Sequence, residues 1–176
     1  MAGTPHVSGT VIPSADLNDR TKVYDRSTSE VDVNTTTAET AVYSKSIGAG
    51  HMSTDRMLRL RIVADYLQNS GTPNITIRVK LGGTTILTIT GSTIAASATR
   101  RGASLLIEIM NLGATNSQVV TAVAPDWAVG PKLIEQLLQT AAVDTSVAAT
   151  LEVTVQHSAS SASISYRKKS AILELV

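Results

Sequence analysis

Three histidines are the first candidates for chemistry, because histidine is the residue most often used as a general base or zinc ligand: His6, His51 and His157. On a helix, His51 and Asp55 would share one face and could hold a metal ion. They lie in and just after the glycine-rich segment 48–52, which favours a loop, and two ligands alone make a poor metal site. The sequence therefore predicts neither a metal nor a cofactor.

No known catalytic motif is present in the sequence. It contains no G-x-S-x-G nucleophile elbow, no H-E-x-x-H zinc motif, no Walker phosphate loop and no dinucleotide fingerprint. Glu108, Glu152 and Glu174 stand singly in alternating segments, where a cross-strand arginine would explain each of them. We therefore expect that the chain is not an enzyme, and an enzyme is the weaker of the alternatives considered below.

Basic side chains recur at outward positions of two segments that should lie near one another. These candidates for docking onto an acidic protein surface are Arg59, Arg61, Arg78 and Lys80. Arginine pairs well with carboxylates, whereas the aromatic residues that would stack on nucleic-acid bases are not interleaved with these cations. The alternative is a solvated face whose cations pair with acidic neighbours such as Asp65 and Glu108.

Composition narrows the class of protein that must position these side chains. The 176 residues carry a net charge of +1 and include no cysteine and no phenylalanine. This predicts no disulfide framework, no nucleic-acid partner and a core of Ile, Leu, Val and Ala, in which β-branched residues favour sheets. No apolar run is long enough to span a membrane, and the N-terminus does not resemble a secretory signal. We expect a soluble protein that is made in a cytoplasm and has no membrane partner.

Period-two alternation of apolar residues predicts strands along most of the chain. It is clearest over residues 57–67, 75–81 and 84–90, which are separated by the turn segment 69–74 and by Gly82-Gly83. We expect these three strands to form an antiparallel meander. Five more are expected at residues 41–47, 103–112, 118–124, 150–157 and 163–176, which makes eight.

One stretch, from Trp127 to about Val143, departs from this alternation. Pro131 precedes apolar residues at helical spacing, which are Leu133, Ile134, Leu137 and Leu138. This pattern predicts a short inserted helix that either caps one end of the sandwich or makes a subunit contact. With eight antiparallel strands, the expected fold is all-β, a two-sheet sandwich with jelly-roll topology.

Residues 1–40 differ in composition from residues 41–176, which are predicted to form the domain. They are polar, rich in Thr and Ser, and are predicted to form an extended N-terminal arm that cannot fold alone. Two short β-like pieces, residues 21–24 and 30–33, could each add a strand to a partner's sheet edge. The candidate partner-docking residues of this arm are Val23, Tyr24, Val31 and Val33. Removal of residues 1–35 is then expected to leave the domain folded.

A subunit interface is expected where apolar residues occupy outward strand positions. A monomer would leave these residues exposed, whereas a three-fold assembly would bury them. They are Met57, Val63, Leu106 and Met110.

The sequence resembles a group of small virion proteins of tailed bacteriophages. The residues that carry the resemblance are Ala38-Glu39-Thr40, Leu58-Arg59-Leu60, the segment from Asp65 to Gly71, the segment from Lys80 to Thr84, and the closing SASISYRKKSAILELV. It covers residues 36–90 well and residues 150–176 moderately, and it includes no active site.

The resemblance implies a jelly-roll body in a virion, often a trimer, that acts as a capsid cement (decoration) protein or as part of a fibre or spike. We therefore expect a homotrimer that binds the major capsid protein on the outer capsid surface and stabilises the shell. Assembly would take place in the host cytoplasm. The alternative is a fibre, spike or tail-associated module that binds receptor carbohydrate, although few Trp or Tyr residues are present to stack on sugars.

Overall fold

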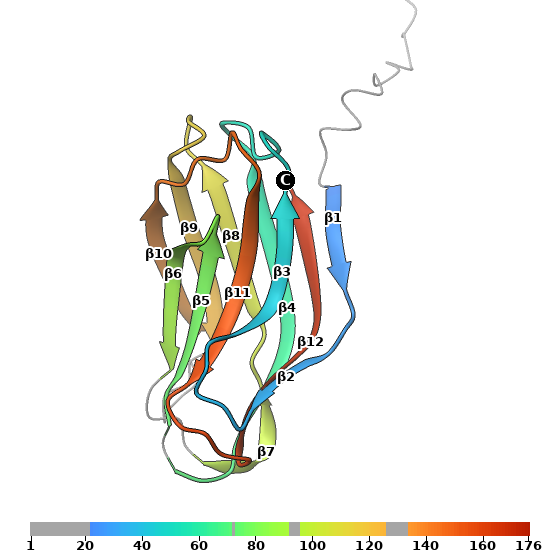
Figure 1. Ribbon diagram of the computed structural model, residues 1–176, viewed down its shortest axis with the longest axis vertical. Coiled ribbons are helices and arrows are strands. Elements are labelled where there is room, and N and C mark those ends of the chain that lie inside the picture. Colours follow the sequence, from blue (N-terminus) through green and yellow to red (C-terminus); the bar gives the residue numbers. More distant parts are fainter. Residues whose placement is uncertain (1–21, 72, 92–95, 126–133) are drawn as a thin grey trace, which may run out of the picture.

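The computed structural model of this chain describes residues 22–71, 73–91, 96–125 and 134–176. These residues form two antiparallel sheets, with twelve strands and no helix, that pack face to face as a sandwich (Figure 1). The large sheet has eight strands: β1 (Lys22–Ser27), β2 (Val31–Asn34), β4 (Met57–Gln68), β7 (Ser97–Gly102), β8 (Leu105–Asn111), β9 (Gln118–Pro125), β10 (Ile134–Ala141) and β12 (Ile164–Leu175). The small sheet has four: β3 (Thr40–Ile47), β5 (Ile75–Leu81), β6 (Thr84–Gly91) and β11 (Ala149–His157).

The chain crosses between the sheets at most of its connections. The order β1-β12-β4-β8 on one side faces β3-β11-β5-β6 on the other, and β9 and β10 extend the first. This is the winding of a jelly roll. The predicted two-sheet antiparallel sandwich is therefore confirmed.

Alternation along the strands places the core between the two sheets. In β4, buried and more exposed residues alternate over the whole strand, and β5 and β12 behave similarly. The largest fully buried side chains include Tyr66, Tyr166, Met52, Leu58, Ile77 and Leu87. Two tyrosines thus supply the aromatic bulk that the missing phenylalanines would otherwise provide.

The expected meander of three strands is wrong at its first step. β5 and β6 form the predicted hairpin around Gly82 and Gly83, both of which have positive φ. β4, however, belongs to the opposite sheet. Both β4 and β5 carry an apolar face, and the crossover lets these two faces pack against each other instead of pointing in one direction.

The strand count of eight and the inserted helix are also wrong. Residues 134–141 form β10, which pairs with β9 along its whole length, from Ile134↔Pro125 to Ala141↔Gln118. A short apolar run fits the period of a helix as well as that of a strand. Here it forms a strand because it can pair with the open edge of β9. Residues 126–133 of the predicted helix lie outside the described residues. β1, β2 and β7 account for the other additional strands.

Residues 22–34 belong to the sandwich itself. β1 pairs with the last third of β12, from Leu175 to Ala171, and β2 pairs with the stretch from Lys168 to Ser165 (Figure 1). The segments that were expected to add strands to a partner instead complete the chain's own sheet, because pairing within one molecule carries no cost of association. Residues 1–21 of the predicted arm lie outside the described residues.

Candidate functional site

The four residues predicted as a subunit interface lie together on the outer face of the large sheet. Met57 of β4 is the register partner of Met110 of β8, and Leu106 is the partner of Arg61. Val63 is 40% exposed and Met110 is 36% exposed, whereas Met57 and Leu106 are half-buried by their neighbours. These four residues therefore share one surface of the large sheet, which we call the outer face.

Sequence reasoning missed one member of this face because it assigned that residue to a helix. Leu138 of β10 is 69% exposed and is the register partner of Thr121, which in turn pairs with Glu108. Partner residues across antiparallel strands point to the same side, so Leu138 continues the row that contains Glu108 and Arg59. The outer face thus extends from β4 across β8 and β9 to β10.

Charged residues on the outer face are partly neutralised within the chain. Arg59 Nε donates to Glu108 Oε1 at 2.9 Å, as the alternative of a cross-strand partner anticipated. Arg61 and Glu174 line a shallow hollow of about 610 Å³ together with Leu106 and Ile172. The surface is therefore mixed, with apolar side chains around a few charges of both signs.

Arg78 and Lys80 do not join Arg59 and Arg61, contrary to the expectation of one basic face. They project from β5 on the small sheet, where both contact Glu39: Arg78 Nη1 at 3.1 Å from Oε2, and Lys80 Nζ at 2.5 Å from Oε1. Thr154 Oγ1 also donates to Glu39 at 2.6 Å. The hydrogen bond from Lys80, then that from Thr154, holds the pKa of Glu39 below its usual value. The four cations are thus divided between the two outer surfaces of the sandwich.

Asp65, the other anticipated acidic partner, pairs with residues outside the predicted set. Arg100 Nη1 lies 2.6 Å from Oδ1, and Arg167 Nη2 lies 3.0 Å from Oδ2. Burial raises the pKa of Asp65, but the hydrogen bonds from Arg167 and Arg100 outweigh this and leave the pKa below its usual value. These ion pairs tie β4, β7 and β12 together.

The partner-docking candidates of the N-terminal segment contribute to the chain's own structure. Val33 is 1% exposed and is part of the core, and Val31 packs against that core. Val23 is 41% exposed on β1. Tyr24 is half-buried, and its hydroxyl is hydrogen-bonded within the chain.

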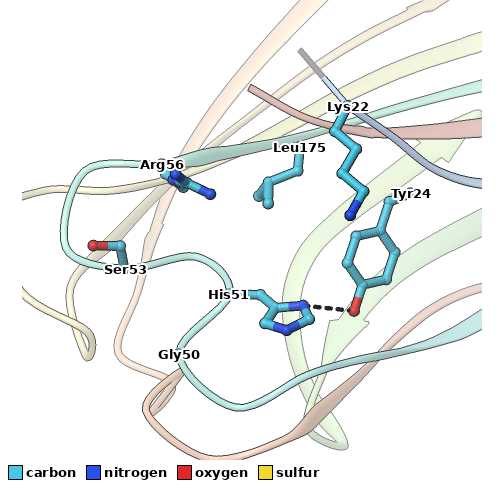
Figure 2. A pocket seen from close by; sticks show the side chains of 7 residues that line it. All are labelled: Lys22, Tyr24, Gly50, His51, Ser53, Arg56 and Leu175. Atoms are coloured by element: carbon cyan, nitrogen blue, oxygen red, sulfur yellow. Dashed lines mark hydrogen bonds between the residues drawn. The ribbon is translucent and has the colours of Figure 1, made fainter. Parts of the chain in front are cut away.

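A second candidate site is a hollow of about 760 Å³ at the end of the sandwich where β1 begins and β12 ends. Figure 2 shows the residues around it: Lys22, Tyr24, His51, Ser53, Arg56 and Leu175. The Tyr24 hydroxyl lies 2.9 Å from His51 Nδ1 and accepts a hydrogen bond from the Gly48 backbone N–H at 3.0 Å. The two rings meet edge to face, with centroids 5.6 Å apart. We call this the Tyr24–His51 hollow.

The histidines do not assemble into a metal or catalytic centre within the described residues. His51 is bonded to Tyr24, whereas His157 is 1% exposed and its Nε2 lies 3.1 Å from the Val33 carbonyl oxygen. Burial lowers the pKa of His157. In the described part of the chain, no three histidine or acidic side chains are grouped so as to hold a metal ion. His6 lies outside it.

The same described residues include no helix that is long and apolar enough to cross a membrane.

No protein-family model matches this sequence, and no curated protein matches it. Among solved structures, VP2 of the infectious bursal disease virus subviral particle is similar at 11% identity and a TM-score of 0.38, over 90% of this chain and 33% of that chain. A structure of the Gt strain of infectious bursal disease virus gives 14% identity and a TM-score of 0.35, with the same coverage. The metal-free lectin I-B4 of Griffonia simplicifolia gives 7% identity and a TM-score of 0.36, over 75% of this chain and 78% of the lectin. This chain spans about a third of the length of VP2, and these similarities assign it no activity.

Proposed function

We propose that this chain is a structural protein of a virus particle. It acts as a cement (decoration) protein that associates with copies of itself, as a homotrimer, and binds the major capsid protein on the outer capsid surface to stabilise the shell. Its localisation is the virion, and it has no catalytic role. The observation that carries the proposal is the outer face of the large sheet, which carries exposed Val63, Met110 and Leu138 and half-buried Met57 and Leu106.

Exposed apolar side chains that share one sheet face cost solubility unless another surface covers them. Burial of apolar area stabilises an interface by roughly 25 cal/mol per Å², so several such side chains together supply a real driving force. The Arg59–Glu108 pair and the unlike charges Arg61 and Glu174 give the face polar contacts that orient a partner. The resemblance of residues 36–90 to virion proteins of tailed bacteriophages supports the same function.

The test is the mass of the purified protein, measured by light scattering behind a sizing column. We expect a stable oligomer of three copies. Val63→Glu combined with Met110→Glu should give a folded monomer, because both side chains are exposed in the single chain. As the matched control, Thr88→Glu places a charge at an exposed position of β6 on the small sheet and should leave the mass unchanged.

The same proteins are then added to shells that lack this chain. Binding by the native protein and by Thr88→Glu, but not by the double variant, supports the proposal. If the double variant retains both the native mass and shell binding, the outer face is not the assembly surface.

The alternative function, a fibre, spike or tail-associated module that binds carbohydrate, is separated by a glycan array. Sugar binding by a protein that does not bind shells would replace the proposal above with that function.

A further inference from the structure

The loop from Gly48 to Arg56, which forms one side of the Tyr24–His51 hollow, is held in place before any ligand arrives. Met52, at its centre, is 1% exposed and packs into the core. Gly50 N–H donates to the Thr145 carbonyl at 3.0 Å, and Asn111 Nδ2 donates to the Ser53 carbonyl at 2.5 Å. Ser53 keeps a positive φ of 47°, a conformation that non-glycine residues adopt only when their surroundings impose it. The hollow therefore has a preorganised rim.

The ring of His51, which belongs to the same loop, is held in one position. A Cβ at Gly48 would lie 2.7 Å from His51 Cε1, so the ring can occupy its place only because residue 48 is glycine. Since Tyr24 Oη accepts the Gly48 N–H, its own proton is best placed on His51 Nδ1. Three residues thus fix one ring position and one tautomer. This arrangement links β1 to the loop.

The charges around the hollow have one sign. Lys22 and Arg56 are cationic, and His51 Nε2 and Ser53 add groups that can donate hydrogen bonds, whereas the Tyr24 proton is already donated to His51 Nδ1. Among the described residues that line the hollow, none is acidic. Figure 2 shows the Lys22 ammonium extending into the space between Tyr24 and Leu175, with Arg56 on the far side of Leu175. β-Pairing of Lys22 with Leu175 fixes the backbone from which that ammonium extends.

From this geometry we propose that the Tyr24–His51 hollow is an oxyanion-binding site that takes a carboxylate or phosphate group carried by a small molecule. Its volume of about 760 Å³ falls within the range of small-molecule sites. The Lys22 ammonium supplies the charge, and Tyr24 and His51 form the wall against which the ligand rests. The residues of this site are not those of the outer face. Anion binding and the proposed assembly can therefore be tested independently.

The test is an NMR titration of the full chain with isotope-labelled histidine, in Tris chloride at constant ionic strength. The imidazole resonances are monitored as each probe is added. The probes are sodium acetate, inorganic phosphate and glucuronate, with uncharged glucose as the negative control. We expect a saturable shift of His51 with at least one anion, no shift with glucose, and no movement of buried His157. Acetate and glucuronate without phosphate would define a carboxylate site, and phosphate alone would define a phosphate site.

Three variants make the test decisive. Lys22→Gln should weaken anion binding about tenfold, which is the loss of one charge-assisted hydrogen bond. Arg26→Gln removes a cation from the same strand outside the hollow and should change nothing. Tyr24→Phe should weaken binding and also alter the His51 nitrogen shifts in the free protein, because the tautomer is no longer fixed. The proposal is overturned if no anion shifts His51, or if Lys22→Gln and Arg26→Gln bind alike.

Discussion

At the scale of single residues, His157 is the buried group whose protonation has the clearest consequence. Its Nε2 must donate to the Val33 carbonyl, since that oxygen can only accept, and among the described residues Nδ1 has no hydrogen-bond partner. The ring packs beside Tyr66, with centroids 6.0 Å apart, and Asp32 is the nearby charge that favours protonation. Burial outweighs both the Val33 bond and Asp32, and it lowers the pKa of His157 from the ordinary value of 6.5. The neutral ring thus fastens β11 to β2.

This shift predicts a loss of stability in weak acid. Because the folded pKa lies below the unfolded one, the contribution is complete above about pH 6.5 and is lost as the pH falls towards the folded pKa. Thermal or urea unfolding between pH 7.5 and 5.5 should show a slope no steeper than about 1.4 kcal/mol per pH unit. The lowered pKa values of Asp25, Glu39 and Asp65 act with the same sign, but only at lower pH.

The variant His157→Gln separates these contributions. An amide can still donate to the Val33 carbonyl but does not titrate, so the slope between pH 7.5 and 5.5 should disappear. His51→Gln is the matched control and should retain it. An unchanged slope in His157→Gln would assign the pH dependence to another group.

Lys168 is the second residue with a measurable effect, because an ammonium group is expensive to bury. It is 2% exposed, and its Nζ donates to Ser27 Oγ at 2.9 Å. Burial lowers its pKa, and the charge of Asp25 opposes this only in part. We expect Lys168→Met to raise the free energy of unfolding by about 1 kcal/mol, since an apolar side chain of similar length removes the desolvation cost.

Urea denaturation checks this expectation, with Lys169→Met as the control. Lys169 is partly exposed and makes a surface ion pair with Glu30, so its replacement should change stability by less than about 1 kcal/mol. If Lys168→Met were destabilising, the contacts with Ser27 and Asp25 would outweigh the cost of burial.

At the scale of elements, the N-terminal strands are held by polar contacts and by one buried valine. Asp25 of β1 accepts hydrogen bonds from Tyr43 at 3.1 Å and Lys45 at 2.9 Å, both on β3, so β1 bridges the two sheets. The bond from Lys45, the larger influence, holds the pKa of Asp25 below its usual value. β2 adds Val33 to the core and the carbonyl that binds His157.

This arrangement reverses the expectation that removal of residues 1–35 leaves the domain intact. The truncation exposes the edge of β12 and uncovers the core at Val33, so we expect a lower melting temperature and a tendency to aggregate. Removal of residues 1–21 alone keeps β1 and β2 and should leave the melting temperature close to that of the full chain. Equal melting temperatures for the two truncations would show that β1 and β2 contribute no stability.

The elements also show what local sequence can and cannot predict. Alternation correctly located β4, β5, β6, β8 and β12. Successive side chains of a strand point to opposite faces, so a strand with one buried face shows apolar residues at every second position. β10 was missed because its apolar residues fit a helix as well as a strand, and only the distant edge of β9 resolves the ambiguity. β1 and β2 were predicted only as short β-like pieces for a partner's sheet, because their own partner, β12, lies at the other end of the chain.

At the scale of the whole molecule, the same limit explains which sites were found. The outer face could be predicted because Met57, Val63, Leu106 and Met110 occupy outward positions of two strands that happen to be neighbours. The joint placement of Arg59 with Arg78 was wrong because it depended on sheet membership, which is set by crossovers. The Tyr24–His51 hollow could not be predicted, since it joins residues 27 positions apart through the pairing of β1 with β12.

Leu138 provides the last test of how the molecule assembles. With 69% of its side chain exposed, it contributes little to the stability of a single chain, so Leu138→Ser should leave the unfolding free energy within about 0.5 kcal/mol of the native value. If the outer face is buried between copies, each lost contact weakens association by about 1 kcal/mol, roughly fivefold.

Light scattering over a dilution series measures that weakening. Val147→Ser is the matched control, because Val147 is 56% exposed in the loop between β10 and β11, outside the outer face. Weaker association in Leu138→Ser alone places the contact on the β8–β10 side of the sheet. If Leu138→Ser and Val147→Ser both associate like the native protein, Leu138 lies outside the interface. Any interface on the outer face would then be confined to β4 and β8.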